Sequence, residues 1–162
     1  MKQTITITLS MGELIYDIQN KTYLTGRAVS NGENFTHVAN MQANDDDENS
    51  SQILRSITMA IATLRSRLSE YLEQGDSGSD NTSLSAKDEV TFNLRMPSNF
   101  NESVTKTLSQ AAHQFVVATA ISDWFAITAK GETAEYRPVA DAGLQILEEA
   151  LSKRRRPERA SS

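Results

Sequence analysis

Cysteine is absent from this chain of 162 residues, and histidine is nearly so. Without cysteine, the protein forms no disulfide bond and offers no thiolate as a nucleophile or metal ligand. The two histidines, His37 and His113, lie in no catalytic or metal-binding motif, and a general base needs a positioned partner. The sequence also contains no glycine-rich phosphate loop, nucleophile elbow or HExxH motif. We therefore expect a protein that is not an enzyme, without catalytic residues, metal or cofactor.

Long apolar runs are missing too, so no segment reaches the length that spans a bilayer, and we expect no membrane partner. The net charge of −5 argues against a protein that binds duplex nucleic acid over its whole surface. Charge is nevertheless uneven, because residues 45–48 form an acidic block and residues 153–156 a basic one. The acidic block lacks the spacing of a calcium-binding loop, which favours a solvated loop over an ion site.

The basic block consists of Lys153, Arg154, Arg155 and Arg156. Guanidinium forks match phosphate oxygens, so these four residues are candidates for a weak contact with DNA or with an acidic partner. The alternative is that they simply complement the dipole at the end of a helix.

Two segments alternate as half-buried strands do. Residues 4–9 alternate threonine with Ile5, Ile7 and Leu9, and residues 90–96 place four apolar side chains on one side before Pro97 ends the strand. A two-stranded sheet is weak by itself. The strands therefore pair with each other under a cover of helices, or they pair with strands of a neighbouring subunit.

Four helices are predicted. Ser10 and Glu13 form a capping box for the first, which we expect to stop at Gly26. The second is capped near Asn49 and carries apolar residues at spacings of three and four up to Tyr71. The third, which closes on residues 127–130, is apolar around most of its circumference and should be central. The fourth is capped by Thr133, with Pro138 in its first turn, where proline is tolerated.

A long loop is predicted over residues 29–50, which are rich in polar residues and show no sustained period. Loops of this length in compact domains are usually functional or disordered. Its apolar members and one histidine suggest that part of it packs down, with a partner as one possible surface, so Phe35, His37, Val38 and Met41 are candidates for an assembly loop.

The predicted fold is α+β and mostly α, with four helices and two β-strands. The order strand–helix–helix occurs twice, which suggests a duplicated unit with halves at residues 1–74 and 87–156 and a linker at 75–86. We expect one domain over residues 1–156 and a disordered tail over residues 157–162.

A resemblance rests on two stretches. Residues 120–128 (AISDWFAIT), followed by Tyr136, a leucine stripe and the closing basic block, form the first, and residues 16–27 (YDIQNKTYLTGR) form the second. In these features the chain resembles small proteins encoded in the structural-gene clusters of tailed bacteriophages and prophages, especially those of Bacteroides-type hosts. The resemblance covers both ends of the chain, leaves out the middle loop and includes no catalytic motif.

The resemblance implies a non-enzymatic virion structural protein, at the head–tail connector or neck or in the tail. Its partners would be further copies of itself, in a ring for example, and other virion proteins, with weak DNA contact. It would be located in the virion, and in the host cytoplasm during assembly. The alternative hypothesis is an intracellular adaptor or regulatory module that binds a partner helix between its own helices.

Overall fold

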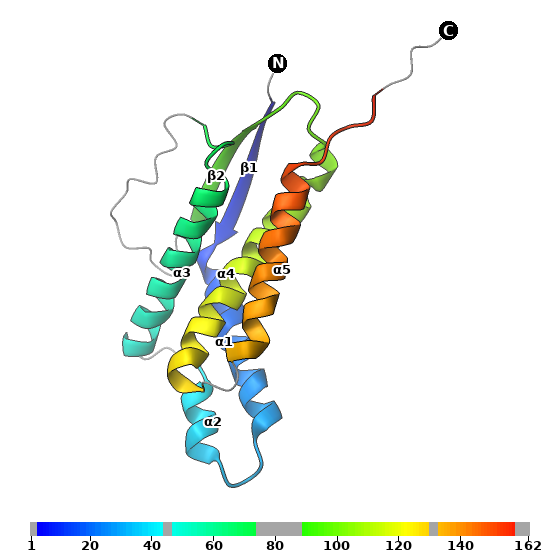
Figure 1. The fold of residues 1–162 in the computed structure, drawn as a ribbon. Coiled ribbons are helices and arrows are strands. Elements are labelled where there is room, and N and C mark those ends of the chain that lie inside the picture. Colours follow the sequence, from blue (N-terminus) through cyan, green and yellow to red (C-terminus); the bar gives the residue numbers. More distant parts are fainter. Residues whose placement is uncertain (1–2, 44–46, 74–88, 130–132, 158–162) are drawn as a thin grey trace.

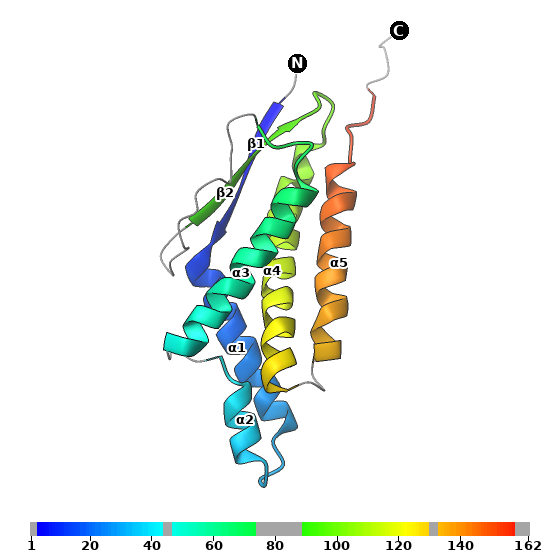
Figure 2. The ribbon, with the colours of Figure 1, turned by 60° about the vertical axis from the view of Figure 1, so that its left-hand side comes forward.

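Helix α4 (Thr105–Thr128) forms the axis of the molecule, and the other elements are arranged around it (Figures 1 and 2). The computed structural model describes residues 3–43, 47–73, 89–129 and 133–157, without the side chains of Asp47 and Thr133. In chain order these residues form β1 (Gln3–Ser10), α1 (Met11–Val29), α2 (Phe35–Met41), α3 (Asp47–Arg67), β2 (Glu89–Met96), the short 3₁₀ helix η1 (Glu102–Val104), α4 and α5 (Thr133–Leu151). The α+β, mostly α fold class is confirmed, with α2 as a helix beyond the four predicted.

The two strands pair with each other in one chain. They are antiparallel over eight residues, with Thr4 opposite Arg95 and Ile7 opposite Phe92. The alternation predicted for both strands is confirmed, because every second side chain, from Ile5 to Leu9 and from Val90 to Met96, is buried. Residues 71–73 add a short stretch at the other edge of β2, where Arg95 N–H donates to the carbonyl of Tyr71 at 2.6 Å.

Helix α4 is buried nearly all round, as its sequence predicted. Twelve of its side chains are buried, including Phe115, Trp124 and Phe125. It approaches α5 closely at Gly143, where a Cβ atom would lie 3.2 Å from the backbone nitrogen of Phe115. On its other sides it packs against α3, α1, α2 and β1.

Helix α1 runs one turn further than predicted. Ser10 does cap it, accepting from the backbone N–H of Glu13 at 3.4 Å. The expected stop at Gly26 is wrong, because α1 continues to Val29 and Gly26 is buried inside it. A Cβ atom at Gly26 would lie 3.4 Å from Val38, so α1 and α2 are in close contact at this glycine.

The segment predicted as a long loop is largely helical. Residues 35–41 form α2, and α3 begins at Asp47, earlier than the predicted cap at Asn49. Met41 is fully buried and its carbonyl accepts the indole N–H of Trp124 at 2.7 Å. Ala43 is buried as well, and its N–H donates to the hydroxyl of Thr22. Tertiary packing against α1 and α4 therefore orders a stretch whose local sequence lacks a clear period.

Helix α5 contains Pro138 in its second turn, which corrects the prediction of the first turn. Proline donates no hydrogen bond to the carbonyl four residues earlier. That residue, Ala134, is exposed, so water can satisfy its carbonyl. The predicted apolar face of α5 is confirmed in Ala140, Leu147 and Leu151, which are buried.

The two predicted halves are unequal in the described residues, because only the first contains an additional helix, α2, between its two long helices. The linker predicted at residues 75–86 lies outside the described residues, as does the tail from residue 158 onward. Duplication of a strand–helix–helix unit therefore stays a prediction.

We expect Trp124→Phe to destabilise the fold by about 1–3 kcal/mol, because the buried carbonyl of Met41 would lose its donor. Urea unfolding followed by circular dichroism would measure this. Tyr16→Phe is the control, since Tyr16 is 66% exposed and its loss of a hydroxyl should change little. Equal stability of both variants would contradict the proposed role of the indole bond.

Candidate functional site

A groove lies along one side of α4. It has a volume of about 680 Å³ and runs between the end of β1 and α1 on one side and the start of α5 on the other. Its floor is Val117, Ala118 and Ile121 of α4, which are almost fully buried. Its walls are polar, with two carboxylates, two lysines and His113.

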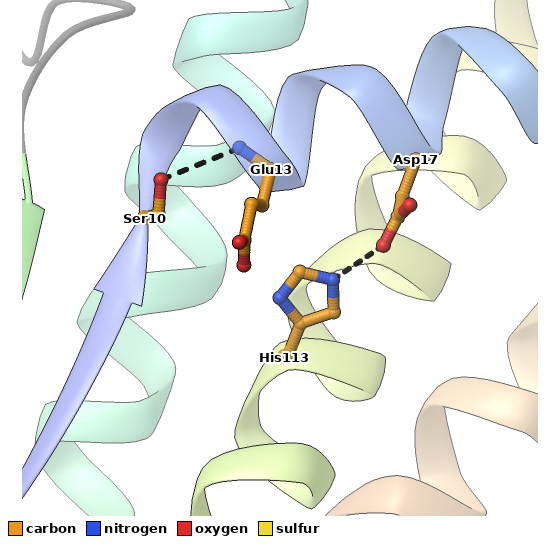
Figure 3. A network of polar contacts seen from close by, with 4 residues as sticks. All are labelled: Ser10, Glu13, Asp17 and His113. Carbon is orange, nitrogen blue, oxygen red and sulfur yellow. Dashed lines mark hydrogen bonds and ion pairs between the residues drawn. The ribbon is translucent and has the colours of Figure 1, made fainter.

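His113 and Asp17 form the central contact of this groove. The imidazole Nε2 lies 2.5 Å from Oδ2 of Asp17, and the two side chains are 26% and 36% exposed. Figure 3 shows His113 of α4 pointing toward Asp17 of α1, with Glu13 directed into the same space one turn earlier. The cap at Ser10 fixes the first turn of α1 and so sets where Glu13 and Asp17 project.

A carboxylate–histidine pair can orient an imidazole for proton transfer. Catalysis by such a pair also needs a nucleophile or a water positioned at the second ring nitrogen. Among the described residues no hydroxyl is hydrogen-bonded to His113. The pair therefore has the geometry of a structural bridge between α1 and α4.

Sequence reasoning singled out His113 but did not identify its partner. Asp17 lies 96 positions away, and only the packing of α1 against α4 brings the two together. The one available signal was that Glu13 and Asp17 share a helical face, one turn apart.

A second hydrogen bond closes the lower end of the groove. The hydroxyls of Thr25 in α1 and Tyr136 in α5 are 2.6 Å apart, and the Tyr136 ring packs on Phe125 of α4 at 5.6 Å between centroids. This contact joins α1 and α5 across α4.

The four residues of the predicted assembly loop differ in their exposure. Phe35 is 71% exposed, His37 is exposed and Val38 is half-buried. Met41 is fully buried in the core, so its side chain is not exposed to a partner in this structure. The assembly role of the segment stays a prediction.

Phe35 sits on a turn that hydrogen bonds hold in place; we call residues 30–35 the tip. The Asn31 side chain accepts from the N–H groups of Glu33 and Asn34, and the Asn34 side chain accepts from Asn31 N–H and donates to Val29. Gly32 occupies the left-handed region at φ 82°, which favours glycine. The tip, which connects α1 to α2, lies at the lower end of the molecule in Figure 1.

The four basic residues lie at the opposite end of the molecule, after α5 (Figure 1). All of them are exposed. Arg154 and Arg155 donate to backbone carbonyls, whereas the side chains of Lys153 and Arg156 have no partner within the described part of the chain.

No group of three or more metal-ligating side chains occurs among the described residues. Of the acidic block at residues 45–48, Asp45 and Asp46 lie outside those residues, and Glu48 is exposed.

Asp123 is the one carboxyl of the described residues with a clear electrostatic perturbation. Burial raises its pKa above the ordinary value of 3.8, and the positive charge of Arg137 offsets part of that rise. The charged form is therefore less favourable in the folded protein than in the unfolded chain.

No protein-family model matches this chain, and neither the curated proteins nor the solved structures yield a similar one. Within the described residues, none of the helices combines the length and apolar composition that crossing a bilayer requires.

We predict that Asp17 and His113 are energetically coupled. A double-mutant cycle with Asp17→Ala and His113→Ala, followed by urea unfolding, should give a coupling free energy of about 0.5–3 kcal/mol. The control cycle pairs Asp17→Ala with Arg55→Ala on α3, and these should be additive. Additivity in both cycles would mean that the contact contributes nothing to stability.

We expect Asp123→Asn to stabilise the protein at pH 7 but not at pH 3. The raised pKa means that the folded state holds more protons than the unfolded state above pH 3.8, so stability falls as pH rises through that window. Asparagine does not ionise, so the variant avoids this loss of stability. Below the window the carboxyl of Asp123 is protonated in both the folded and the unfolded state, so the substitution gains nothing there. Thermal melts at the two pH values measure it, and an equal effect at both would contradict the desolvation argument.

Proposed function

We propose that this chain is a non-enzymatic structural protein of a tailed bacteriophage particle, at the head–tail connector or neck or in the tail, where it assembles with further copies of itself. The observation that carries the assembly role is Phe35, a large apolar side chain exposed on a tip that is braced by four side-chain hydrogen bonds. The location in a phage particle rests on the resemblance in residues 16–27 and in residues 113–159.

The braced tip suits an interface for an energetic reason. An exposed phenylalanine on a flexible loop would lose conformational freedom on binding, which offsets part of the burial energy. A pre-formed turn removes most of that cost. Large aromatic side chains in defined positions are typical anchors of protein interfaces.

Other exposed apolar side chains surround this end of the molecule. Tyr23, Leu24, Phe35 and Ile127 are between 44% and 71% exposed, and they come from α1, α2 and the last turn of α4. Single exposed apolar residues are normal, but several at one end favour a surface that a partner covers.

Strand exchange between subunits is not needed for this assembly, because β1 and β2 already pair within one chain. We therefore place the self-association on the helical end with the tip rather than on the sheet. Other virion proteins are the second class of partner that this proposal includes.

An intracellular adaptor is the second candidate, and one observation favours it. The groove on α4 has a volume of about 680 Å³, and Val139 on its rim is 40% exposed. Helices commonly bind in grooves between helices.

Light scattering at low and high concentration tests the proposal. We expect the wild-type protein to form a defined oligomer, and Phe35→Ser to raise the dissociation constant roughly 30-fold, which corresponds to loss of an anchor worth about 2 kcal/mol. Met59→Ser is the matched control, because Met59 is 67% exposed but lies on α3.

A concentration-independent monomer would count against self-assembly and in favour of the adaptor. Equal effects of Phe35→Ser and Met59→Ser would mean that the oligomer depends on general surface apolarity rather than on the tip.

A further inference from the structure

The basic segment after α5 is fixed to the body of the protein by its backbone. Its residues run antiparallel to residues 98–101, with a β-bridge between Phe100 and Arg154. Asn101 N–H donates to the carbonyl of Lys153 at 3.2 Å, and Arg155 N–H donates to the carbonyl of Asn99 at 2.7 Å. Phe100 itself is fully buried, so the segment is paired with a stretch that belongs to the core.

The four cations of this segment divide into two kinds. The guanidinium of Arg154 donates to Leu151 and Lys153, which caps the end of α5, and that of Arg155 donates to the carbonyl of Ser98 at 2.6 Å. These two arginines hold the segment in place. Lys153 and Arg156 are exposed, and no described residue bonds to their side chains.

The segment keeps its full positive charge in this arrangement. A carbonyl acceptor is neutral, so Arg154 and Arg155 remain cations after bonding to it. Ion pairs would cancel the charge, but within the described ranges no carboxylate is paired with this segment, and the pair between Arg67 and Glu148 lies elsewhere. Four consecutive positive charges are thus presented on a fixed backbone in a protein of net charge −5.

We propose that residues 153–156 bind the phosphate backbone of nucleic acid, with Lys153 and Arg156 as the contacting residues and Arg154 and Arg155 as positioning residues. Lysine and arginine side chains are the usual partners of phosphate, and arginine matches its oxygens with two parallel bonds. A fixed backbone lowers the entropy that the side chains lose on binding.

The chemistry favours phosphates over bases and over acidic polypeptides. None of the four side chains is an aromatic platform for stacking or an amide that pairs with adenine, and cations that bind phosphate oxygens carry no sequence information. Nucleic acid supplies a regular, dense row of charges to a compact cluster, whereas an acidic polypeptide must be ordered first. The negative charge of the rest of the protein confines the contact to this end.

This inference goes beyond assembly and is independent of it. The basic segment and the tip lie at opposite ends of the molecule in Figure 1, so variants at one end leave the other intact. Loss of DNA binding and loss of oligomer formation can therefore be told apart.

Fluorescence anisotropy with a labelled DNA duplex, at salt concentrations from about 50 to 200 mM, tests the proposal. We expect weak binding whose logarithm falls linearly with the logarithm of salt concentration. The double variant Lys153→Ala/Arg156→Ala should reduce that slope by roughly 2, about 0.9 for each phosphate that the variant no longer neutralises. Circular dichroism should show its fold unchanged, because neither side chain has a described partner.

The matched control is Lys21→Ala/Lys106→Ala, which removes the same charge from the groove and should leave the slope unchanged. Arg155→Ala keeps Lys153, Arg156 and the backbone bonds that fix the segment, and should weaken binding less than Arg156→Ala does. Three results would overturn the proposal: no DNA binding by the wild type at low salt, equal reductions in slope for both double variants, or equally tight binding to polyglutamate.

Discussion

The enclosure of α4 is the constraint on which the rest of this structure depends. A helix that is apolar around its circumference must be covered on every side, and no single neighbour is wide enough to do so. The cover here comes from α1, α2, α3, α5 and β1, which are distant in sequence but all contact α4. Gly143 allows α5 to approach α4 more closely than any side chain would permit, and the indole of Trp124 ties α2 to the same helix.

The surface features that the proposals use lie outside this enclosure, in the groove between α1 and α5 and at the two ends of the elongated molecule (Figure 2). Asp17 and His113 form a polar contact in the groove that joins α1 to α4. The ends carry the features that the proposals use: an exposed phenylalanine at one and exposed cations at the other.

Both ends share a physical principle, which is that a binding residue is presented from a fixed backbone. The side chains of Asn31 and Asn34 hold the turn before Phe35, whereas the backbone carbonyls of Ser98 and Asn99 accept hydrogen bonds from Arg155 in the basic segment. In each case hydrogen bonds made during folding order the segment, which lowers the entropy that a later contact would cost.

The sequence by itself determined the strands, the long helices and the central place of α4, because alternation and spacings of three and four reflect which side of each element faces the core. Only the tertiary structure decided the rest. Gly26 and Pro138 are local breakers that packing overrides, and α2 forms because α1 and α4 cover Met41. The pairing of Asp17 with His113, and the hydrogen bond from the Arg155 side chain to the carbonyl of Ser98, depend on segments that meet across the fold. Local periodicity contains no information about such meetings, since they are set by how whole elements pack.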